Sequence, residues 1–193
     1  MDTLMLAQLR PAIVLMALFT LLLGLAYPLA VTGVAQLAFP SAANGSMIER
    51  NGQLVGSALI GQAFASPRYF HGRPSAAGQN GYDASSSSGS NLGPTSKALA
   101  ERIAGDVAKA RSEDGLAGPV PADLVTASAS GLDPDISPAS AQAQAARVAR
   151  ERGLSEPQVR ALVDRTVQKR LFGLIGEPRV NVLALNLALD ELK

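Results

Sequence analysis

Cysteine and tryptophan are absent from this chain of 193 residues, and histidine occurs once, as His71. Without cysteine the protein cannot form disulfides, and one histidine is too few for the usual Cys and His ligand sets of zinc, so we expect no metal site. Hydrolase signatures are missing as well, because no serine stands in a Gly-x-Ser-x-Gly or Ser-x-x-Lys pattern. We therefore expect no catalytic residues. A triad is defined in space, however, so His71 acting on a loop serine remains an alternative.

The chain also has no large excess of positive or negative charge, and aromatic residues are scarce. The formal net charge is +1, and basic and acidic residues are interspersed, so the chain has no electrostatic footprint for nucleic acid. Aromatic residues make up 4% of the chain, and alanine supplies much of its apolar share. We expect a thin core and a domain that depends partly on a partner for stability.

A long uncharged run is the clearest positive feature. No Asp, Glu, Lys, Arg or His occurs from Pro11 to Ile48, and residues 12–39 are almost wholly apolar. About 20 apolar residues in a helix cross a bilayer, so this run predicts one membrane anchor. The span could stop near Tyr27, with Pro28 beginning an exit or a kink. A cleaved signal peptide and a buried core helix are the alternatives, but both are usually much shorter than this run.

The orientation follows from the flanking charges. Arg10 and the α-amino group favour a cytoplasmic N-terminus, and no charge follows the run until Glu49. We predict a cytoplasmic tail over residues 1–10, a transmembrane helix over 11–37 and a single domain outside the cytoplasm over 38–193.

Local patterns beyond the anchor predict an α+β domain with one small sheet and about four helices. Residues 47–55 read as a hairpin turning at Asn51-Gly52, with strand continuing over 57–61. Residues 67–94, rich in Gly, Ser, Pro and Asn, predict either a flexible tip or an ordered functional loop. Helices are predicted over 95–111, 138–153 and 155–172, from the cap residues Thr95, Ser137 and Ser155 and from apolar spacing. Asn181 could cap a last helix, but the residues after it fit a helix or a strand.

Candidate binding residues are few, and each has a structural alternative. Arg68 and Arg73 could bind an anion or a partner carboxylate, or could flank a strand edge whose aromatic side chains point inward. Residues 89–95 resemble a phosphate loop, but they fit better as a turn before a helix. Asp133 and Asp135 suggest a cation site or, more simply, a turn with Asx hydrogen bonds. Thr20 and Gly24 have the spacing of small residues that lets another helix approach.

Several sequence blocks, taken in order, resemble one known family over essentially the whole chain. The blocks follow the N-terminal span and cover residues 44–46 (NGS), 56–62 (GSALIGQ), 69–75 (YFHGRPS), 89–92 (GSNL), 125–133 (VTASASGLD), 147–149 (RVA), 180–182 (VNV) and 185–190 (LNLALD). In this order they resemble the C subunits of the bacterial Kdp high-affinity potassium-transporting P-type ATPase.

The resemblance implies a non-catalytic subunit with no cofactor of its own. It also implies a single-pass protein of the bacterial inner membrane whose domain over residues 38–193 is periplasmic. Its expected partners are a channel-like subunit that carries potassium, a P-type subunit that hydrolyses ATP and a small single-span subunit, so potassium and ATP act through the complex. Candidate subunit contacts are Thr20, Gly24, Tyr69, Phe70, His71, Arg73, Ser90 and Asn91. The alternative function is a membrane-anchored periplasmic hydrolase that uses His71 and a loop serine.

The resemblance also implies a catalytic chaperone that raises the ATP affinity of the hydrolysing subunit. The family's nucleotide-contacting glutamine matches Gln144 here. A periplasmic domain would face away from cytoplasmic ATP, which conflicts with direct contact. Gln142 and Gln144 fit equally well on the exposed face of an amphipathic helix.

Overall fold

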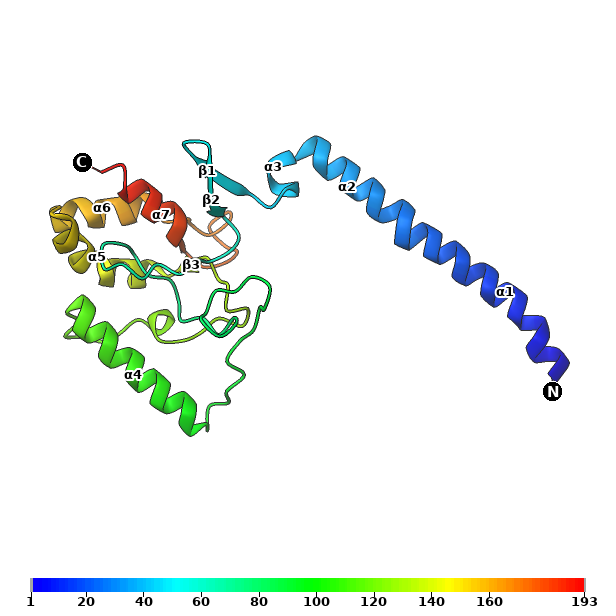
Figure 1. The fold of residues 1–193 in the computed structure, drawn as a ribbon, viewed down its shortest axis with the longest axis horizontal. Coiled ribbons are helices and arrows are strands. Elements are labelled where there is room, and N and C mark those ends of the chain that lie inside the picture. The colour runs from blue at the N-terminus through cyan, green and yellow to red at the C-terminus, as the bar shows by residue number, and fades with distance from the viewer. Residues whose placement is uncertain (1, 193) are drawn as a thin grey trace. The chain divides into compact units, whose positions relative to one another are not determined.

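The computed structural model describes residues 2–192, and the chain divides into two units, one ending at Met47 and the other beginning at Ile48. The first unit consists of helix α1 (Asp2–Leu21), a π-helical turn (Leu22–Ala26), α2 (Tyr27–Ala38) and the short α3 (Pro40–Ala43), as Figure 1 shows. Within it, Ala7–Ala38 is long and apolar enough to cross a membrane. Its most apolar window has a mean hydropathy of 2.3 and no buried residue.

Pro28 does not end the helix, so the early stop considered near Tyr27 is not observed. The helix passes through Tyr27 and Pro28 and continues to Ala38. Proline has no N–H to donate to the preceding turn, and the π turn lies directly before it, where Tyr27 N donates to the Leu22 carbonyl. The helix ends at Phe39, which adopts φ −140° ahead of Pro40, as expected for a residue before proline.

The second unit opens with the predicted hairpin, formed by β1 (Met47–Arg50) and β2 (Gln53–Ser57). Asn51 and Gly52 have φ values of 54° and 75°, which confirms the tight turn with two positive φ angles. The predicted continuation of the strand to residue 61 is wrong. The chain turns after Ser57, whose hydroxyl accepts a hydrogen bond from Leu59 N at 3.1 Å.

Four α-helices follow within residues 48–192, as the sequence predicted. They are α4 (Lys97–Asp114), α5 (Pro138–Arg152), α6 (Glu156–Thr166) and α7 (Val182–Leu189), with a 3₁₀ turn at Ala122–Leu124. The predicted caps of α5, α6 and α7 are confirmed at Ser137, Ser155 and Asn181, whereas Ser96 rather than Thr95 caps α4.

Helix α6 ends six residues before the predicted boundary at Phe172. Val167 leaves the helical conformation with ψ 119°, and Gln168 then pairs with Arg179 across a hairpin. The residues after Asn181, which fitted either a helix or a strand, form α7.

Two small sheets replace the single one predicted, within the described residues of the second unit. Besides β1–β2, strand β3 (Asp135–Ile136) pairs antiparallel with β4 (Val180–Asn181). The core lies among α5, α6 and α7 and includes Phe70 from the long loop. Valine, leucine and alanine supply most of its side chains, and Phe70 is its one aromatic member among the described residues, which agrees with the expected thin core.

The loop over residues 67–94 is ordered by hydrogen bonds. The Ser75 hydroxyl donates to the Gly131 carbonyl at 2.6 Å and accepts from Tyr82 N at 2.7 Å. The Tyr82 hydroxyl donates to the Arg73 carbonyl at 2.5 Å. Burial first, and then the charge of Asp133, raises the pKa of Tyr82 to about 12. Of the two predicted interpretations, the ordered loop is therefore the one observed.

Candidate functional site

Gln144 lies on the inner face of α5. The helix begins after the cap residue Ser137, and its helical spacing places Gln144 on the same buried face as Ala141 and Val148. Its side chain is 1% exposed. The amide oxygen accepts from His71 N at 2.8 Å, and the amide nitrogen donates to the His71 carbonyl at 3.1 Å. The interpretation of Gln144 as part of an exposed face is therefore wrong, because its amide pairs with the backbone of residue 71 as a neighbouring strand would.

Arg147, one turn further along α5, joins the same arrangement. Its guanidinium donates to the Asp114 carboxylate at 2.6 Å, to the Pro67 and Tyr69 carbonyls at 2.5 and 2.9 Å, and to Gln144 at 2.7 Å. The side chains of the Arg147–Asp114 pair are 3% and 7% exposed. Since Asp114 is the last residue of α4, this buried ion pair connects α4, α5 and the extended segment 67–71.

A second amide holds the same segment from the other side. Asn186 of α7 accepts from Phe70 N at 2.9 Å and donates to the Phe70 carbonyl at 3.0 Å. The backbone of residues 70 and 71 is thus paired with side chains of two helices. Phe70 itself is completely buried and offers no surface to another subunit. Tyr69 is half-buried, lies 4.6 Å from the Arg152 guanidinium and donates to Asp190.

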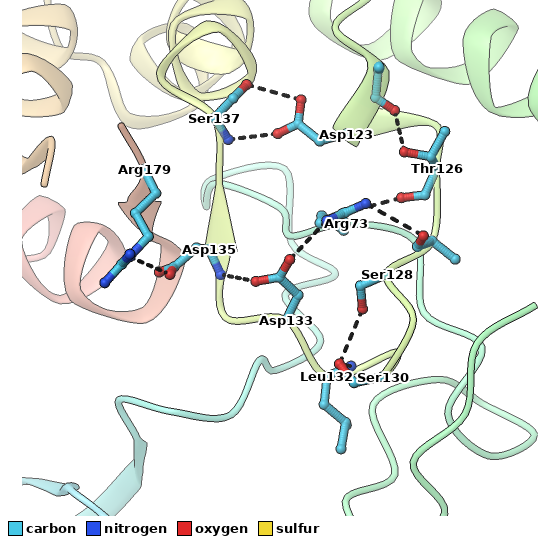
Figure 2. Close-up of polar contacts among 12 residues, drawn as sticks. Arg73, Asp123, Thr126, Ser128, Ser130, Leu132, Asp133, Asp135, Ser137 and Arg179 are labelled. Atoms are coloured by element: carbon cyan, nitrogen blue, oxygen red, sulfur yellow. Dashed lines mark hydrogen bonds and ion pairs between the residues drawn. The ribbon is translucent and has the colours of Figure 1, made fainter. Parts of the chain in front are cut away.

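Arg73 binds an internal carboxylate rather than a free anion. As Figure 2 shows, it reaches Asp133 at 2.9 Å and the carbonyls of Thr126 and Ala127 at 3.3 and 3.4 Å. It therefore fixes the shape of the serine-rich segment 125–133. The Asx turn predicted at residues 133–135 is confirmed, because Asp135 N donates to the Asp133 carboxylate at 3.0 Å. Residues 2–192 contain no group of three or more acidic or histidine side chains suited to a metal ion.

The start of α5 is held by Asp123. Its carboxylate accepts from Ser137 N at 2.6 Å, from the Ser137 hydroxyl at 3.0 Å and from the Ser140 hydroxyl at 2.5 Å (Figure 2 draws the Ser137 contacts). Burial alone would raise the pKa of Asp123, but these hydrogen bonds outweigh it and lower the pKa. In Asp135, burial and the neighbouring Asp133 raise the pKa despite the Arg179 guanidinium.

A polar cleft of about 440 Å³ lies beside Gln144. Its walls come from residues 63–65, 71–75, 80–82 and α4, and they include His71, Lys109 and the carboxylates Asp106, Glu113 and Asp114. Burial and then the nearby Arg147 charge lower the pKa of His71. The His71 ring Nε2 lies 3.1 Å from the Ser66 carbonyl oxygen, and the described contacts of the ring include no serine hydroxyl. The geometry therefore provides no Ser–His pair for a hydrolase.

The remaining candidate residues lie on exposed segments. Ser90 is half-buried and Asn91 is exposed, with φ 51°, in the loop that leads to α4. That loop is the turn expected from sequence, since Ser96 N donates to the Gly93 carbonyl at 2.9 Å. Thr20 and Gly24 are exposed on the anchor, and Gly24 falls in the π turn.

The family model described as "K+-transporting ATPase, c chain" matches residues 9–191. The chain belongs to the KdpC family. Relatives named "Potassium-transporting ATPase KdpC subunit" include one from Caulobacter vibrioides, 65% identical over 188 residues that cover 96% of this chain and 94% of the relative. Others come from Gemmatimonas aurantiaca, at 60% identity with 97% and 94% covered, and Bradyrhizobium diazoefficiens, at 57% with 97% and 98% covered. KdpC proteins are subunits of a potassium-transporting ATPase, which confirms the family resemblance and does not support the hydrolase alternative.

The sequence did not predict the roles of Asp114 and Asn186. Asp114 reads as an ordinary charge at a helix end, although it forms a buried ion pair. Asn186 carried a usable signal, because it is a single amide within the apolar run 182–189 and shares the inward face with Leu185 and Leu189. A polar group on a buried face needs a partner, and here the partner is the Phe70 backbone.

Proposed function

We propose that this chain is an accessory, non-catalytic subunit that assembles and stabilises a potassium-transporting ATPase. The observation that carries the proposal is the family match over nearly the entire chain, which includes the candidate membrane span Ala7–Ala38. A span with no buried residue has its whole surface free for lipid or for other membrane helices. In this proposal the partners are the channel-like, ATP-hydrolysing and small single-span subunits. Potassium and ATP act through the complex.

The proposed topology places residues 1–10 in the cytoplasm and the second unit in the periplasm, with the helix in the inner membrane. Arg10 before the span and the absence of charge until Glu49 support this orientation. Because the chain has no cysteine, Ser86→Cys introduces a single label site in an exposed part of the loop. A membrane-impermeant thiol reagent should label this site in spheroplasts. Labelling that requires lysis would reverse the orientation.

In this proposal, a chaperone effect of this chain on the ATP affinity of the hydrolysing subunit passes through contacts between the subunits. Two observations favour this over direct contact by Gln144. Its amide oxygen already accepts two hydrogen bonds, and its amide nitrogen already donates to the His71 carbonyl. The proposed periplasmic position also separates Gln144 from cytoplasmic ATP.

Purification of the complex from mild detergent tests the proposal. The chain should remain bound to two larger multi-span subunits, and removing it should abolish potassium-stimulated ATPase activity. A chain that purifies alone and turns over a substrate by itself would contradict an accessory role. Thr20→Leu/Gly24→Leu tests the anchor contact and should weaken co-purification, whereas Val14→Leu, an exposed apolar exchange on the same helix, should not.

A further inference from the structure

The hairpin after α6 exposes apolar side chains at its tip. Gln168 and Arg179 pair at its base, with backbone hydrogen bonds of 2.8 and 3.1 Å, and Leu171 and Ile175 pair near its end at 2.9 and 3.0 Å. Gly173 and Gly176, with φ 74° and 82°, allow the tight return. The hairpin is therefore a defined structure that holds its tip in one arrangement.

Four large apolar residues form this tip, and none of them joins the core. Leu171 and Ile175 are 59% and 63% exposed, and Phe172 and Leu174 are 85% and 82% exposed. Single exposed leucines are common, but a contiguous exposed group of large apolar side chains marks a surface that contacts another apolar phase. We call residues 171, 172, 174 and 175 the apolar tip.

Basic residues flank the apolar tip along the chain. Residues 165–179 contain Arg165, Lys169, Arg170 and Arg179 against one carboxylate, Glu177, which gives a net charge of +3. Two of these arginines also form ion pairs, Arg170 with Glu177 at 2.5 Å and Arg179 with Asp135 at 2.9 Å. Leucine and phenylalanine next to lysine and arginine are typical of segments that lie at the surface of an anionic bilayer.

The chain itself keeps this unit near a membrane. The candidate span ends at Ala38 and the second unit begins at Ile48, so the linker covers residues 39–47. Fully extended, at about 3.6 Å per residue, it would reach roughly 30 Å. Because it includes the short helix α3, its actual reach is shorter. The chain that leaves the hairpin base is attached close to the start of the second unit, because Asn181 donates to the Ala58 carbonyl at 3.0 Å, just after β2. The hairpin base thus lies near the part of this unit that the linker enters.

We infer that the apolar tip inserts into the interfacial layer of the bilayer that holds the anchor, with the basic side chains among anionic headgroups. The hairpin is then a second, shallow membrane attachment that restricts how the second unit tilts on its short linker. The inference goes beyond the proposed subunit role and requires only that the candidate span lies in a bilayer.

Single-cysteine labelling tests the inference on the full chain. Phe172→Cys and Leu174→Cys, each carrying an environment-sensitive fluorophore, are placed in bilayers with phosphatidylglycerol and with lipid-attached quenchers. The matched control is Ala108→Cys, which is also exposed. It belongs to helix α4, which Figure 1 shows on the opposite side of the second unit from β1 and β2. Both tip residues are more than four-fifths exposed, so neither substitution removes core packing.

The tip labels should shift to the blue and lose most of their emission to lipid quenchers, while the control label should do neither. A higher salt concentration or uncharged lipid should weaken the quenching. Tip labels that resemble the control would overturn the inference. A blue shift without lipid quenching that appears only in the assembled complex would also overturn it, since the tip would then contact another subunit. The labelling result is independent of co-purification, because labelling tests contact between the tip and lipid, whereas co-purification tests the proposed function.

Discussion

Replacing Gln144 separates a structural role from a nucleotide-binding role. In Gln144→Leu, the side chain keeps a similar size and apolar contacts within α5 but loses its amide. The backbone N–H and carbonyl of His71 then have no partner, and Arg147 loses one of its four acceptors. We expect a less stable domain with an unchanged anchor helix.

The magnitude follows from the two stranded backbone groups. A buried polar group without a partner costs about 1–3 kcal/mol. His71 is half-buried beside the polar cleft, so water can reach part of this backbone and reduce the penalty. The sum is about 2–4 kcal/mol, a large share of the stability of an ordinary domain.

Urea unfolding of the full chain in mild detergent, followed by far-ultraviolet circular dichroism, measures this loss. The control is Gln142→Leu, on the same helix, whose amide contacts Asp164 and the Arg160 carbonyl near the surface. It should cost about 1 kcal/mol or less. If Gln144→Leu unfolds like the control while the assembled ATPase that contains it needs a higher ATP concentration, the structural role is wrong, because the amide would then act on the nucleotide.

Three further predictions concern the second unit. Gly131→Ala should lower the free energy of unfolding by about 2–4 kcal/mol, since a Cβ there would lie 2.5 Å from the Ser88 carbonyl oxygen. In the control Gly115→Ala, φ is nearly the same but the space is open, so the loss should be about 1 kcal/mol. Equal shifts of the melting temperature in the two variants would contradict the packing argument. Asp123→Asn should cost about 1–3 kcal/mol at pH 7. Because the pKa of Asp123 is lowered in the folded state, its contribution to folding stability is present above the ordinary value of 3.8 and is lost as the pH falls through the folded pKa. The variant should therefore lose less of its stability to urea below pH 3.8 than the wild type does. An identical pH dependence would show that Asp123 does not contribute. The raised pKa of Tyr82, about 12, means that its contribution to stability is complete below pH 10 and is lost between pH 10 and 12. In an absorbance titration that follows tyrosine ionisation in the folded chain, Tyr82→Phe should remove the step near pH 12. If a step near pH 10 disappears instead, the raised pKa is wrong.

The sequence predicted those elements whose signals are local. Ser137-Pro138 and Gly153 delimit α5 because a cap hydroxyl, a proline at the first helical position and a left-handed glycine each act within one turn. Asn51-Gly52 determines its hairpin for the same reason. The uncharged run predicts a helix long enough to span a bilayer because length and polarity alone decide that question.

Features that depend on distant partners could not be predicted in the same way. Helix α6 stops at Thr166 although its apolar pattern continues, because residues 168–179 pair with each other instead. Strands β3 and β4 have two residues each, too few for any periodicity, and they form only because segments 45 residues apart meet. The sequence left Gln144 open between a nucleotide contact and an exposed helix face, because its actual partner, the His71 backbone, lies 73 residues away.

Potassium-stimulated ATPase activity of the purified complex, measured with and without this chain, tests whether the chain acts as an accessory subunit. The complex lacking the chain should lose this activity and regain it when the full chain is added back, while the chain alone should have none. Full potassium-stimulated activity in a complex that lacks the chain would contradict the proposed role.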